Sequence, residues 1–200
     1  MKKIAVFISG RGSNLKALIE AIQRDVLRAI IVLVISNKAQ AQGLDHAEKA
    51  GIASLVIEAG GYKSHEDYEK ALLLQLSVAK VDYIVLAGYM KLLGETMFTA
   101  YAGKIINIHP SLLPKFKGLR AQRQALEAGE SVSGCTVHYV IPEMDAGPIV
   151  DQEEVPIKEG DNEESLSARI LEKEHHLFPK AIQQILDGKF KNIENKLQGK

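Results

Sequence analysis

The sequence predicts an α/β protein built on an open, mainly parallel sheet with helices on both faces. Two observations support this over the first half of the chain. Short, continuous apolar runs alternate with stretches of helical periodicity, and the apolar runs end in glycine or polar turns. Parallel strands buried on both faces have this appearance and need crossover helices. A third observation, two late strand patterns separated by a short loop, predicts an antiparallel extension.

Five apolar runs are expected to form the parallel strands. They are rich in β-branched residues and are bounded by glycine or by polar residues, as short buried strands usually are. The helices between them should cover both faces of the sheet. The expected strands are residues 4–8, 30–35, 53–57, 83–87 and 104–108.

Three helices are expected between the first four strands, because apolar residues recur there at helical spacing. The second helix ends near Ala50, and Gly51 follows in the position of a C-terminal cap. The apolar positions of the first helix are Leu15, Leu18, Ile19 and Ile22, and those of the third are Tyr68, Leu72 and Leu76.

The pattern changes after Pro110. The later strands follow one another closely, which favours antiparallel pairing, and the last helix is long and amphipathic. We expect a helix at 122–128, strands at 134–141 and 148–156, a helix at 163–186, and an edge strand or loose tail at 189–200. The whole therefore predicts a single domain over residues 1–200, with a Rossmann-like sheet and an antiparallel C-terminal extension.

Composition favours a soluble, cytoplasmic protein, either monomer or homodimer. The 200 residues are 46% hydrophobic, which allows one sizeable core. The formal net charge is zero, so nothing in the total favours nucleic acid or an anionic membrane. No apolar run is long enough to span a bilayer. The single cysteine, Cys135, cannot form an internal disulfide, which fits a reducing compartment.

Residues 9–14, Ser-Gly-Arg-Gly-Ser-Asn, join the first strand to the first helix. Glycines let backbone N–H groups approach an anion, and the helix N-terminus adds unpaired donors. Ser13 and Asn14 add side-chain donors. The spacing matches neither the dinucleotide fingerprint nor the nucleotide phosphate loop. The segment therefore predicts a binding site for a phosphomonoester. The alternative interpretation is that it only forms a tight turn, with the asparagine as a helix cap.

Residues 106–114, Ile-Asn-Ile-His-Pro-Ser-Leu-Leu-Pro, lie at the end of the last parallel strand, where open α/β sheets bind ligands. Asn107 and His109 project from the same face of an extended strand. An amide and an imidazole that donate to one oxygen suit a developing oxyanion. The alternative interpretation is that His109 has only a structural role, as a histidine at the end of a strand whose ring hydrogen-bonds to backbone groups.

The turn between the two late strands, residues 143–148, contains Asp145. An aspartate that precedes small residues often has no role beyond stabilising the turn. Asp145 is therefore a catalytic candidate on one condition, that the fold brings its carboxylate to His109. There it would orient the imidazole ring and stabilise its protonated form.

The remaining histidines do not predict a metal site. His138 lies on a strand pattern and is expected to be structural or part of a wall. His46, His175 and His176 have no cysteine or carboxylate at metal-ligand spacing. Lysines and aromatics form no extended pattern for nucleic acid either.

Taken together, these segments resemble the folate-dependent formyltransferases. Each segment is weak alone, but their order and spacing over nearly the whole chain make the resemblance specific. The segments are residues 8–15, 36–39, 86–93, 107–114 and 144–149, with Glu174 and His175 in the last helix.

The resemblance implies a formyltransferase fold and an activity. A formyl group would pass from 10-formyltetrahydrofolate, as co-substrate, to the amine of 5′-phosphoribosylglycinamide, a one-carbon step of purine biosynthesis. Transfer would be direct, through a tetrahedral intermediate. The partners would be these small molecules, with no metal, nucleic acid or membrane.

The resemblance also implies roles by position. Asn107, His109 and Asp145 would form the catalytic set. Gly12, Ser13 and Asn14 would hold the substrate phosphate, and Glu174 would contact the substrate amine. The folate would be bound by His65, Met90, Lys91, Leu92, Leu93 and Asn107.

Two positions depart from the family pattern. Arg120 stands where relatives carry a histidine near the catalytic aspartate, and His65 stands where many carry an arginine associated with ligand contact. Neither belongs to the catalytic set, so both bear on affinity rather than on the presence of the activity.

Three other functions share part of this pattern. Methionyl-tRNA formyltransferase and formyltetrahydrofolate deformylase share the catalytic set, but the first adds a C-terminal tRNA-binding domain and the second an N-terminal regulatory domain. This chain is expected to carry neither. A non-catalytic phosphate-binding module would leave the Asn107, His109 and Asp145 combination unexplained.

Overall fold

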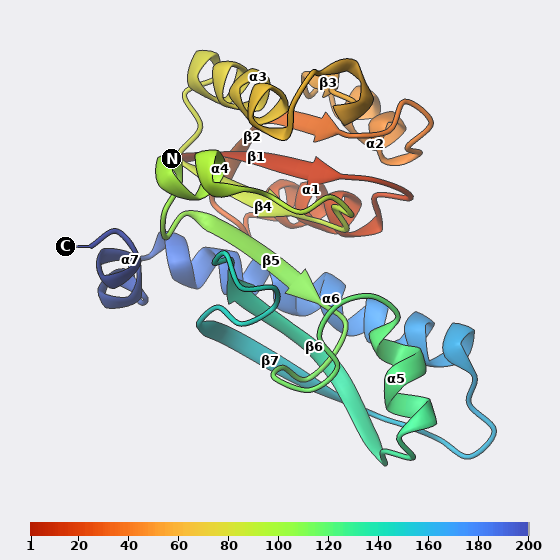
Figure 1. Cartoon of the computed structure of the whole chain (residues 1–200). Helices are drawn as coiled ribbons and strands as arrows, with labels where there is room; N and C mark the ends of the chain where they lie inside the picture. The colour runs from red at the N-terminus through yellow and green to blue at the C-terminus, as the bar shows by residue number, and fades with distance from the viewer. Residues whose placement is uncertain (200) are drawn as a thin grey trace.

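The computed structural model describes residues 1–199 and contains one seven-stranded sheet (Figure 1). The strands are β1 (Lys2–Ile8), β2 (Ala29–Ser36), β3 (Ser54–Val56), β4 (Tyr83–Leu86), β5 (Ile105–His109), β6 (Val132–Tyr139) and β7 (Ile149–Pro156). The helices are α1 (Ser13–Gln23), α2 (Gly43–Lys49), α3 (His65–Val78), α4 (Glu95–Ala100), α5 (Ala121–Glu127), α6 (Glu163–Leu186) and α7 (Lys191–Leu197), with a 3-10 turn η1 (Ala59–Gly61).

The strand order is β3-β2-β1-β4-β5-β6-β7. Pairing is parallel from β3 to β5 and antiparallel from β5 to β7, which confirms the expected sheet and its C-terminal extension. The chain builds outward from β1 to β3 and then returns to place β4 on the other side of β1. The connections therefore diverge between β1 and β4, and such a switch point opens a crevice for ligands at the carboxyl ends of the strands.

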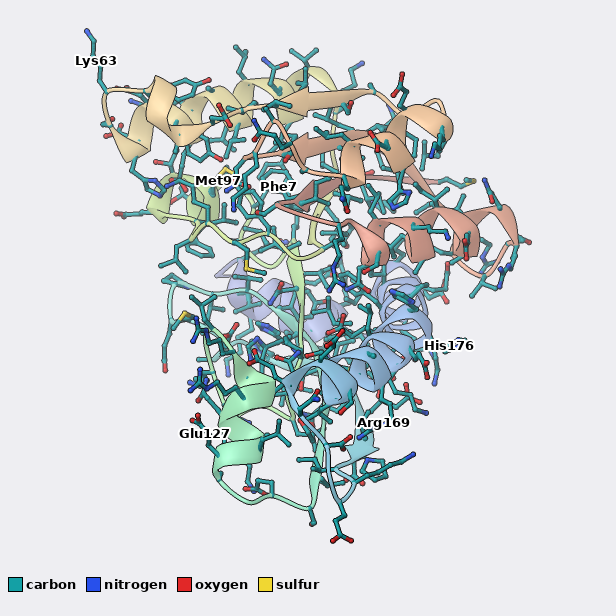
Figure 2. The ribbon with its side chains drawn as sticks, turned by 90° about the vertical axis from the view of Figure 1, so that its right-hand side faces the viewer. Phe7, Lys63, Met97, Glu127, Arg169 and His176 are labelled. Atoms are coloured by element: carbon teal, nitrogen blue, oxygen red, sulfur yellow. The ribbon has the colours of Figure 1, made fainter. Side chains whose placement is uncertain are left out.

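Alternate residues of β1 face opposite sides of the sheet, because successive strand side chains project in opposite directions. Ile4 and Val6 pack with α1 and α6 in one core. Ala5 and Phe7 pack in the other core, together with Met97 of α4 (Figure 2). These residues are fully buried. Burial on both faces explains why the first strand reads as a continuous apolar run.

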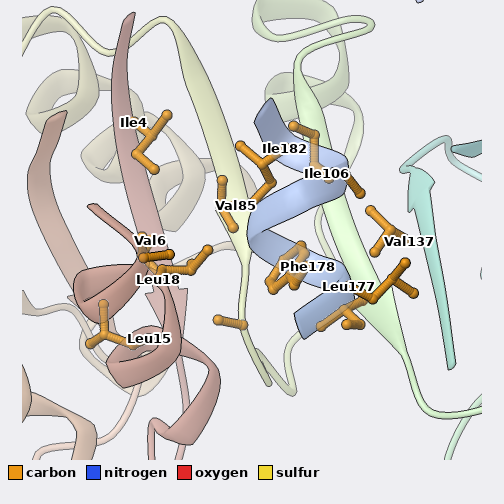
Figure 3. Close-up of a cluster of buried hydrophobic side chains, with 14 of the residues drawn as sticks. Ile4, Val6, Leu15, Leu18, Val85, Ile106, Val137, Leu177, Phe178 and Ile182 are labelled. Carbon is orange, nitrogen blue, oxygen red and sulfur yellow. The ribbon is translucent and has the colours of Figure 1, made fainter. Parts of the chain in front are cut away.

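Helix α6 packs across three strands on the first face and so fixes the position of Glu174. Phe178 and Ile182 lie against Val85 of β4 and Ile106 of β5 (Figure 3). Because interiors are close-packed, this contact sets both the rotation and the depth of the helix. Glu174 lies one helical turn before Phe178 and is buried beside the carboxyl ends of the strands.

A capping box fixes the first turn of α6 where the sequence predicts it. The Asn162 side chain accepts a hydrogen bond from the Ser165 N–H at 2.9 Å, and the Ser165 hydroxyl accepts one from the Asn162 N–H at 3.1 Å. Such reciprocal caps satisfy two N–H groups that the helix itself leaves unpaired.

The expectation of an edge strand or loose tail at 189–200 is wrong over the described residues, because α7 forms there beside the C-terminus (Figure 1). Ile193 and Leu197 pack against the first core. Glu194 is buried and accepts hydrogen bonds from the hydroxyls of Tyr83 at 3.0 Å and Tyr139 at 3.2 Å. The sequence did not reveal this helix because one of its buried positions, Glu194, is a charged residue. Its hydrogen-bond partners, Tyr83 and Tyr139, lie on strands that are distant in sequence.

The short elements α4 and η1 were not expected from the sequence. Six and three residues respectively are too few for a periodic pattern to stand out. No helix among residues 1–199 is long and apolar enough to cross a membrane.

The connection between β6 and β7 is held against the end of β6 by two contacts with Tyr139. The Tyr139 N–H donates to the Pro148 carbonyl oxygen at 2.9 Å. Gly147 lies so close to Tyr139 that an added Cβ would stand 1.7 Å from the Tyr139 carbonyl oxygen. Only glycine fits this contact, which holds in place the turn that carries Asp145.

Substitution of Gly147 tests this contact. We expect Gly147→Ala to lower the free energy of unfolding by about 1–3 kcal/mol, because the methyl group has to displace the turn from Tyr139. Denaturant unfolding followed by circular dichroism measures the change. Gly60→Ala is the control, since open space surrounds that position, and its effect should stay within about 0.5 kcal/mol. Equal unfolding midpoints for the two variants would contradict the role given to Gly147.

Candidate active site

A cleft of about 430 Å³ opens at the carboxyl ends of β1, β4 and β5. Its walls come from the 10–14 loop, from Gly88 and Met90 after β4, and from Glu174 and Leu171 of α6. This is the switch point of the sheet, and the volume falls in the range of small-molecule sites.

Two glycines give the 10–14 loop its shape. Gly12 adopts a φ of 71°, in the left-handed region that favours glycine. Gly43, the first residue of α2, packs against it so closely that a Cβ on Gly12 would lie 2.4 Å from the Gly43 Cα. The Gly43 N–H donates to the Gly10 carbonyl oxygen at 3.0 Å. The loop is thereby held with the N-terminus of α1, including Ser13, at the cleft.

Asn14 and Glu174 meet in the cleft wall from opposite ends of the chain. The Asn14 Nδ2 donates to the Glu174 Oε2 at 2.7 Å, and both residues are buried. Burial raises the pKa of Glu174 to about 7, and the hydrogen bond from Asn14 partly opposes that rise. The Asn14 Oδ1 is buried without a hydrogen-bond partner among residues 1–199. The cleft thus contains a free acceptor beside a carboxyl group that titrates near neutral pH.

Asn107 projects from β5 directly opposite His138 of β6. The His138 Nδ1 donates to the Tyr139 carbonyl oxygen at 2.9 Å, so its Nε2 can accept a hydrogen bond from the Asn107 Nδ2 at 3.1 Å. Burial lowers the pKa of His138, although the Tyr139 carbonyl and Asp145 act in the other direction. A neutral His138 therefore orients the Asn107 amide and leaves its second N–H available.

His109 faces acceptors at both ring nitrogens. The Phe116 carbonyl oxygen lies 2.8 Å from Nε2, and the Asp145 Oδ2 lies 3.4 Å from Nδ1. A carbonyl and a carboxylate both accept hydrogen bonds from ring N–H groups. The ring is buried. The fold therefore holds the imidazole between two acceptors beside the cleft.

The condition placed on Asp145 is met, because the fold brings its carboxylate to His109. The Asp145 Oδ2 also accepts a hydrogen bond from the Gly118 N–H at 2.8 Å, and its Oδ1 lies 3.7 Å from the His138 Nε2. Asp145 adopts a φ of 50°, a strained backbone region for most residues other than glycine. Three elements that are distant in sequence therefore converge on one carboxylate.

The segment after β4 runs from Met90, in the cleft lining, to Gly94, and His65 lies beside Gly94. Met90 and Leu92 are 64% and 70% exposed. The His65 Nε2 lies 3.5 Å from the Glu69 Oε1, and an added Cβ on Gly94 would lie 3.1 Å from that nitrogen. The structure thus places His65 against the far end of this segment and outside the cleft lining.

Comparison with known proteins identifies the family. The family model for formyl transferase matches residues 2–182. The chain belongs to the formyl transferase family. It is 43% identical over 192 residues to the phosphoribosylglycinamide formyltransferase of Escherichia coli strain K12, a match that covers 96% of this chain and 91% of that protein.

Two further comparisons place this formyl transferase among its relatives. It is 51% identical to the trifunctional purine biosynthetic protein adenosine-3 of Drosophila pseudoobscura pseudoobscura, over 96% of this chain but only 14% of that longer protein. The crystal structure of glycinamide ribonucleotide transformylase 1 from Symbiobacterium toebii matches with a TM-score of 0.93 and 45% identity, over 94% of this chain and 89% of that one.

The residues predicted from the sequence gather in two groups. Asn107, His109 and Asp145 come together beside the cleft, and the loop residues 12–14 come together with Glu174 within it. Arg120 immediately precedes α5, has a φ of 57° and is exposed.

Sequence reasoning missed two contributors to the formyl transferase site. His138 was expected to be structural or part of a wall, yet it hydrogen-bonds to Asn107 and lies close to Asp145. The strand pairing that places it there gives no local signal. Gly43 supports the 10–14 loop from α2, and its only signal is a glycine at the start of a helix.

Substitution of Glu174 should change how stability depends on pH. The folded-state pKa of about 7 lies above the ordinary value of 4.5, so the unfolded chain loses this proton first as the pH rises. The stabilising contribution is complete below the ordinary value and is lost as the pH rises through 7. The free energy of unfolding of the wild type relative to Glu174→Gln should therefore fall by on the order of 3 kcal/mol between about pH 4 and pH 8.

Denaturant unfolding over this pH range measures the difference. Glu172→Gln, an exposed neighbour on the same helix, serves as the matched control and should follow the wild type. Parallel profiles for the wild type and Glu174→Gln would show that burial does not raise the pKa of this carboxyl group.

Proposed function

We propose that this chain transfers the formyl group of 10-formyltetrahydrofolate to the amine of 5′-phosphoribosylglycinamide, a step of purine biosynthesis. The observation that carries the proposal is the convergence of Asn107, His109 and Asp145 beside a cleft that also contains a helix N-terminus and a buried carboxyl group. The names of the relatives that match over nearly their whole length support the choice of substrates.

The ribonucleotide occupies the cleft with its phosphate at the N-terminus of α1. The N–H groups that the first helical turn leaves unpaired, near Gly12, Ser13 and Asn14, bind phosphate oxygens, and the helix dipole favours the negative charge. Glu174 contacts the amine that will be formylated. The hydrogen bond from the Asn14 Nδ2 fixes the orientation of this carboxyl group in the cleft wall.

The catalytic set stabilises the charge that develops during transfer. The neutral amine attacks the formyl carbon, and the carbonyl oxygen becomes a tetrahedral oxyanion. Asn107 and His109 donate hydrogen bonds to this oxyanion, which is the interaction that gains most in the transition state. The His109 Nε2 faces the Phe116 carbonyl oxygen at 2.8 Å, so its donation to the oxyanion requires residues 115–120 to shift.

Asp145 completes the step by balancing charge and moving a proton. Its carboxylate stabilises the protonated His109 and, directly or through water, helps to carry the proton from the attacking amine to the departing N10 of the folate. Collapse of the intermediate forms formylglycinamide ribonucleotide and releases tetrahydrofolate. The protein supplies orientation and electrostatics, while the reactive formyl group belongs to the folate.

The folate lies along the segment after β4. Backbone groups of Met90, Lys91, Leu92 and Leu93 line the pterin pocket, and the turn at Asp145 closes it. Asn107 touches both the folate and the oxyanion, and His65 contacts the folate from the rim of the cleft. We further propose a cytoplasmic location and a monomer or homodimer.

A turnover assay with both substrates tests the function directly. We expect formylated ribonucleotide to accumulate, with neither formyl-methionyl-tRNA nor free formate as the main product. Activity should survive dialysis against a chelator, since no group of three or more histidine, cysteine or carboxylate side chains among residues 1–199 is arranged to hold a metal. Full loss of activity on dialysis that zinc or magnesium restores would refute the metal-free mechanism, and formate as the main product would indicate a hydrolase.

The catalytic roles predict a specific kinetic signature. His109→Ala and Asp145→Asn should each lower kcat by roughly 10²–10³-fold, while both KM values change little. The first variant loses a preorganised donor to the oxyanion, and the second loses the carboxylate that stabilises the protonated His109 and helps to move the proton. The amide oxygen introduced by Asp145→Asn can still accept the hydrogen bond from the Gly118 N–H, so loss of the turn geometry does not explain the effect of that variant. Steady-state kinetics measure the result, and near wild-type kcat in either variant would remove that residue from the catalytic set.

A further inference from the structure

The segment from Met90 to Gly94 is anchored at both ends by side chains from other elements. The Met90 N–H donates to the Ser9 Oγ at 2.8 Å, and the Gly94 N–H donates to the Glu69 Oε1. We propose that Ser9, oriented by Asn37, and Glu69 are positioning residues that hold this segment in its folate-binding conformation. The inference rests on the proposed function.

The first anchor is a hydrogen-bond chain across three strand ends. Ser9 follows β1 and is buried, and its hydroxyl donates to the Asn37 Oδ1 at 2.6 Å. Because that amide oxygen only accepts, the hydroxyl hydrogen points to Asn37 and a lone pair points to the Met90 N–H. Asn37 follows β2 and Met90 lies after β4. The chain therefore crosses the switch point of the sheet and ties the segment to the parallel core.

The second anchor is a carboxylate on α3. Glu69 is 1% exposed, and its polar contacts are the Gly94 N–H and the His65 Nε2. A buried carboxylate that hydrogen-bonds to a backbone N–H makes a strong, directional contact. The neighbouring Tyr68 adds to it, because its hydroxyl lies 2.5 Å from the Tyr89 hydroxyl. Consecutive residues of α3 thus contact both sides of the segment.

Between these anchors the support is partial: Leu93 packs against the core that contains Phe7, and the Lys91 Nζ lies 5.3 Å from the centroid of the Tyr68 ring. The segment contains no helix or strand between the end of β4 and the start of α4. Met90 and Leu92 are largely exposed, so packing does not fix them. A segment that binds a ligand through backbone groups loses affinity if it must first be ordered, and pre-organisation removes that cost. The anchors supply the pre-organisation that the exposed side chains cannot.

Ser9→Ala and Asn37→Ala test the first anchor. Ser9→Ala leaves the Met90 N–H without its acceptor, whereas Asn37→Ala keeps that acceptor but frees the hydroxyl to rotate. We expect the KM for formyl-folate to rise roughly 5- to 30-fold in Ser9→Ala and by a smaller factor in Asn37→Ala. The KM for the ribonucleotide should stay within about threefold of wild type, since the 10–14 loop is held by Gly43.

Ser133→Ala is the matched control. Ser133 is also a buried serine at the sheet, but its hydroxyl has no hydrogen-bond partner among residues 1–199. Its removal should leave both KM values unchanged. A general loss of stability in Ser9→Ala would instead move both KM values together and lower kcat as well.

Glu69→Ala and Glu69→Gln test the second anchor. Glutamine keeps an oxygen that can accept from the Gly94 N–H, and alanine does not. The KM for formyl-folate should therefore rise in Glu69→Ala by roughly 5- to 30-fold and return toward wild type in Glu69→Gln. Equal KM values in the two variants would show that the contact with Gly94 does not position the segment.

Amide hydrogen exchange separates this inference from the proposed function. Exchange at Met90 should accelerate in Ser9→Ala, and exchange at Gly94 should accelerate in Glu69→Ala, while β1 amides keep wild-type rates. This readout needs no substrate. Wild-type exchange at both amides, or an unchanged KM for formyl-folate in both alanine variants of an active enzyme, would overturn the positioning role. Absence of formyl transfer by the wild type itself would overturn the proposed function instead.

Discussion

The antiparallel pairing of β6 with β5 is the constraint on which the site depends. It sets His138 opposite Asn107 and Thr136 opposite His109, so the two catalytic candidates of β5 gain a polar wall. The turn between β6 and β7 begins beyond Tyr139, which pairs with Ile106, and it folds back along β5 so that Asp145 reaches His109. A sixth parallel strand would follow only after a crossover helix, and a short turn of this kind would not then lie beside β5.

Buried carboxylates recur at the places where distant elements meet. Glu174 joins α6 to the 10–14 loop through Asn14, Glu69 joins α3 to the segment after β4, and Glu194 joins α7 to the sheet. Each is almost fully removed from water, so each requires partners to offset its desolvation. Of the three, Glu174 lines the cleft, and burial raises its pKa to about 7.

Backbone strain gathers in the two loops that approach His109. Phe116 and Arg120 in one loop and Asp145 in the other adopt positive φ values, as does Gly118 between the first two. The loops are joined by the hydrogen bond from Gly118 to Asp145, and an ion pair between Lys117 and Glu143 bridges them outside. Non-glycine residues hold such conformations only where surrounding contacts fix them. The first loop also supplies the Phe116 carbonyl oxygen, which lies 2.8 Å from the His109 Nε2.

The sequence by itself determined the order and type of the main elements. Apolar runs and helical spacing are local properties, and they located β1 to β7 and α6 to within a few residues because strands buried on both faces and long amphipathic helices leave strong periodic signals. The same patterns failed for α4, which is too short, and for α7, where a buried glutamate reads as a polar surface position. Motifs also placed Asn107 and His109 on one strand face and a glycine-containing loop at the start of the first helix.

Only the tertiary structure decided which residues share the site. Asp145 reaches His109, and Asn14 reaches Glu174, through pairings whose partners lie far apart along the chain, and no local pattern encodes such a distance. The roles of His138, Ser9 and Glu69 belong to the same class. Each depends on strand register or helix packing, which arise from the cooperative burial of many side chains rather than from the residue type at any one position.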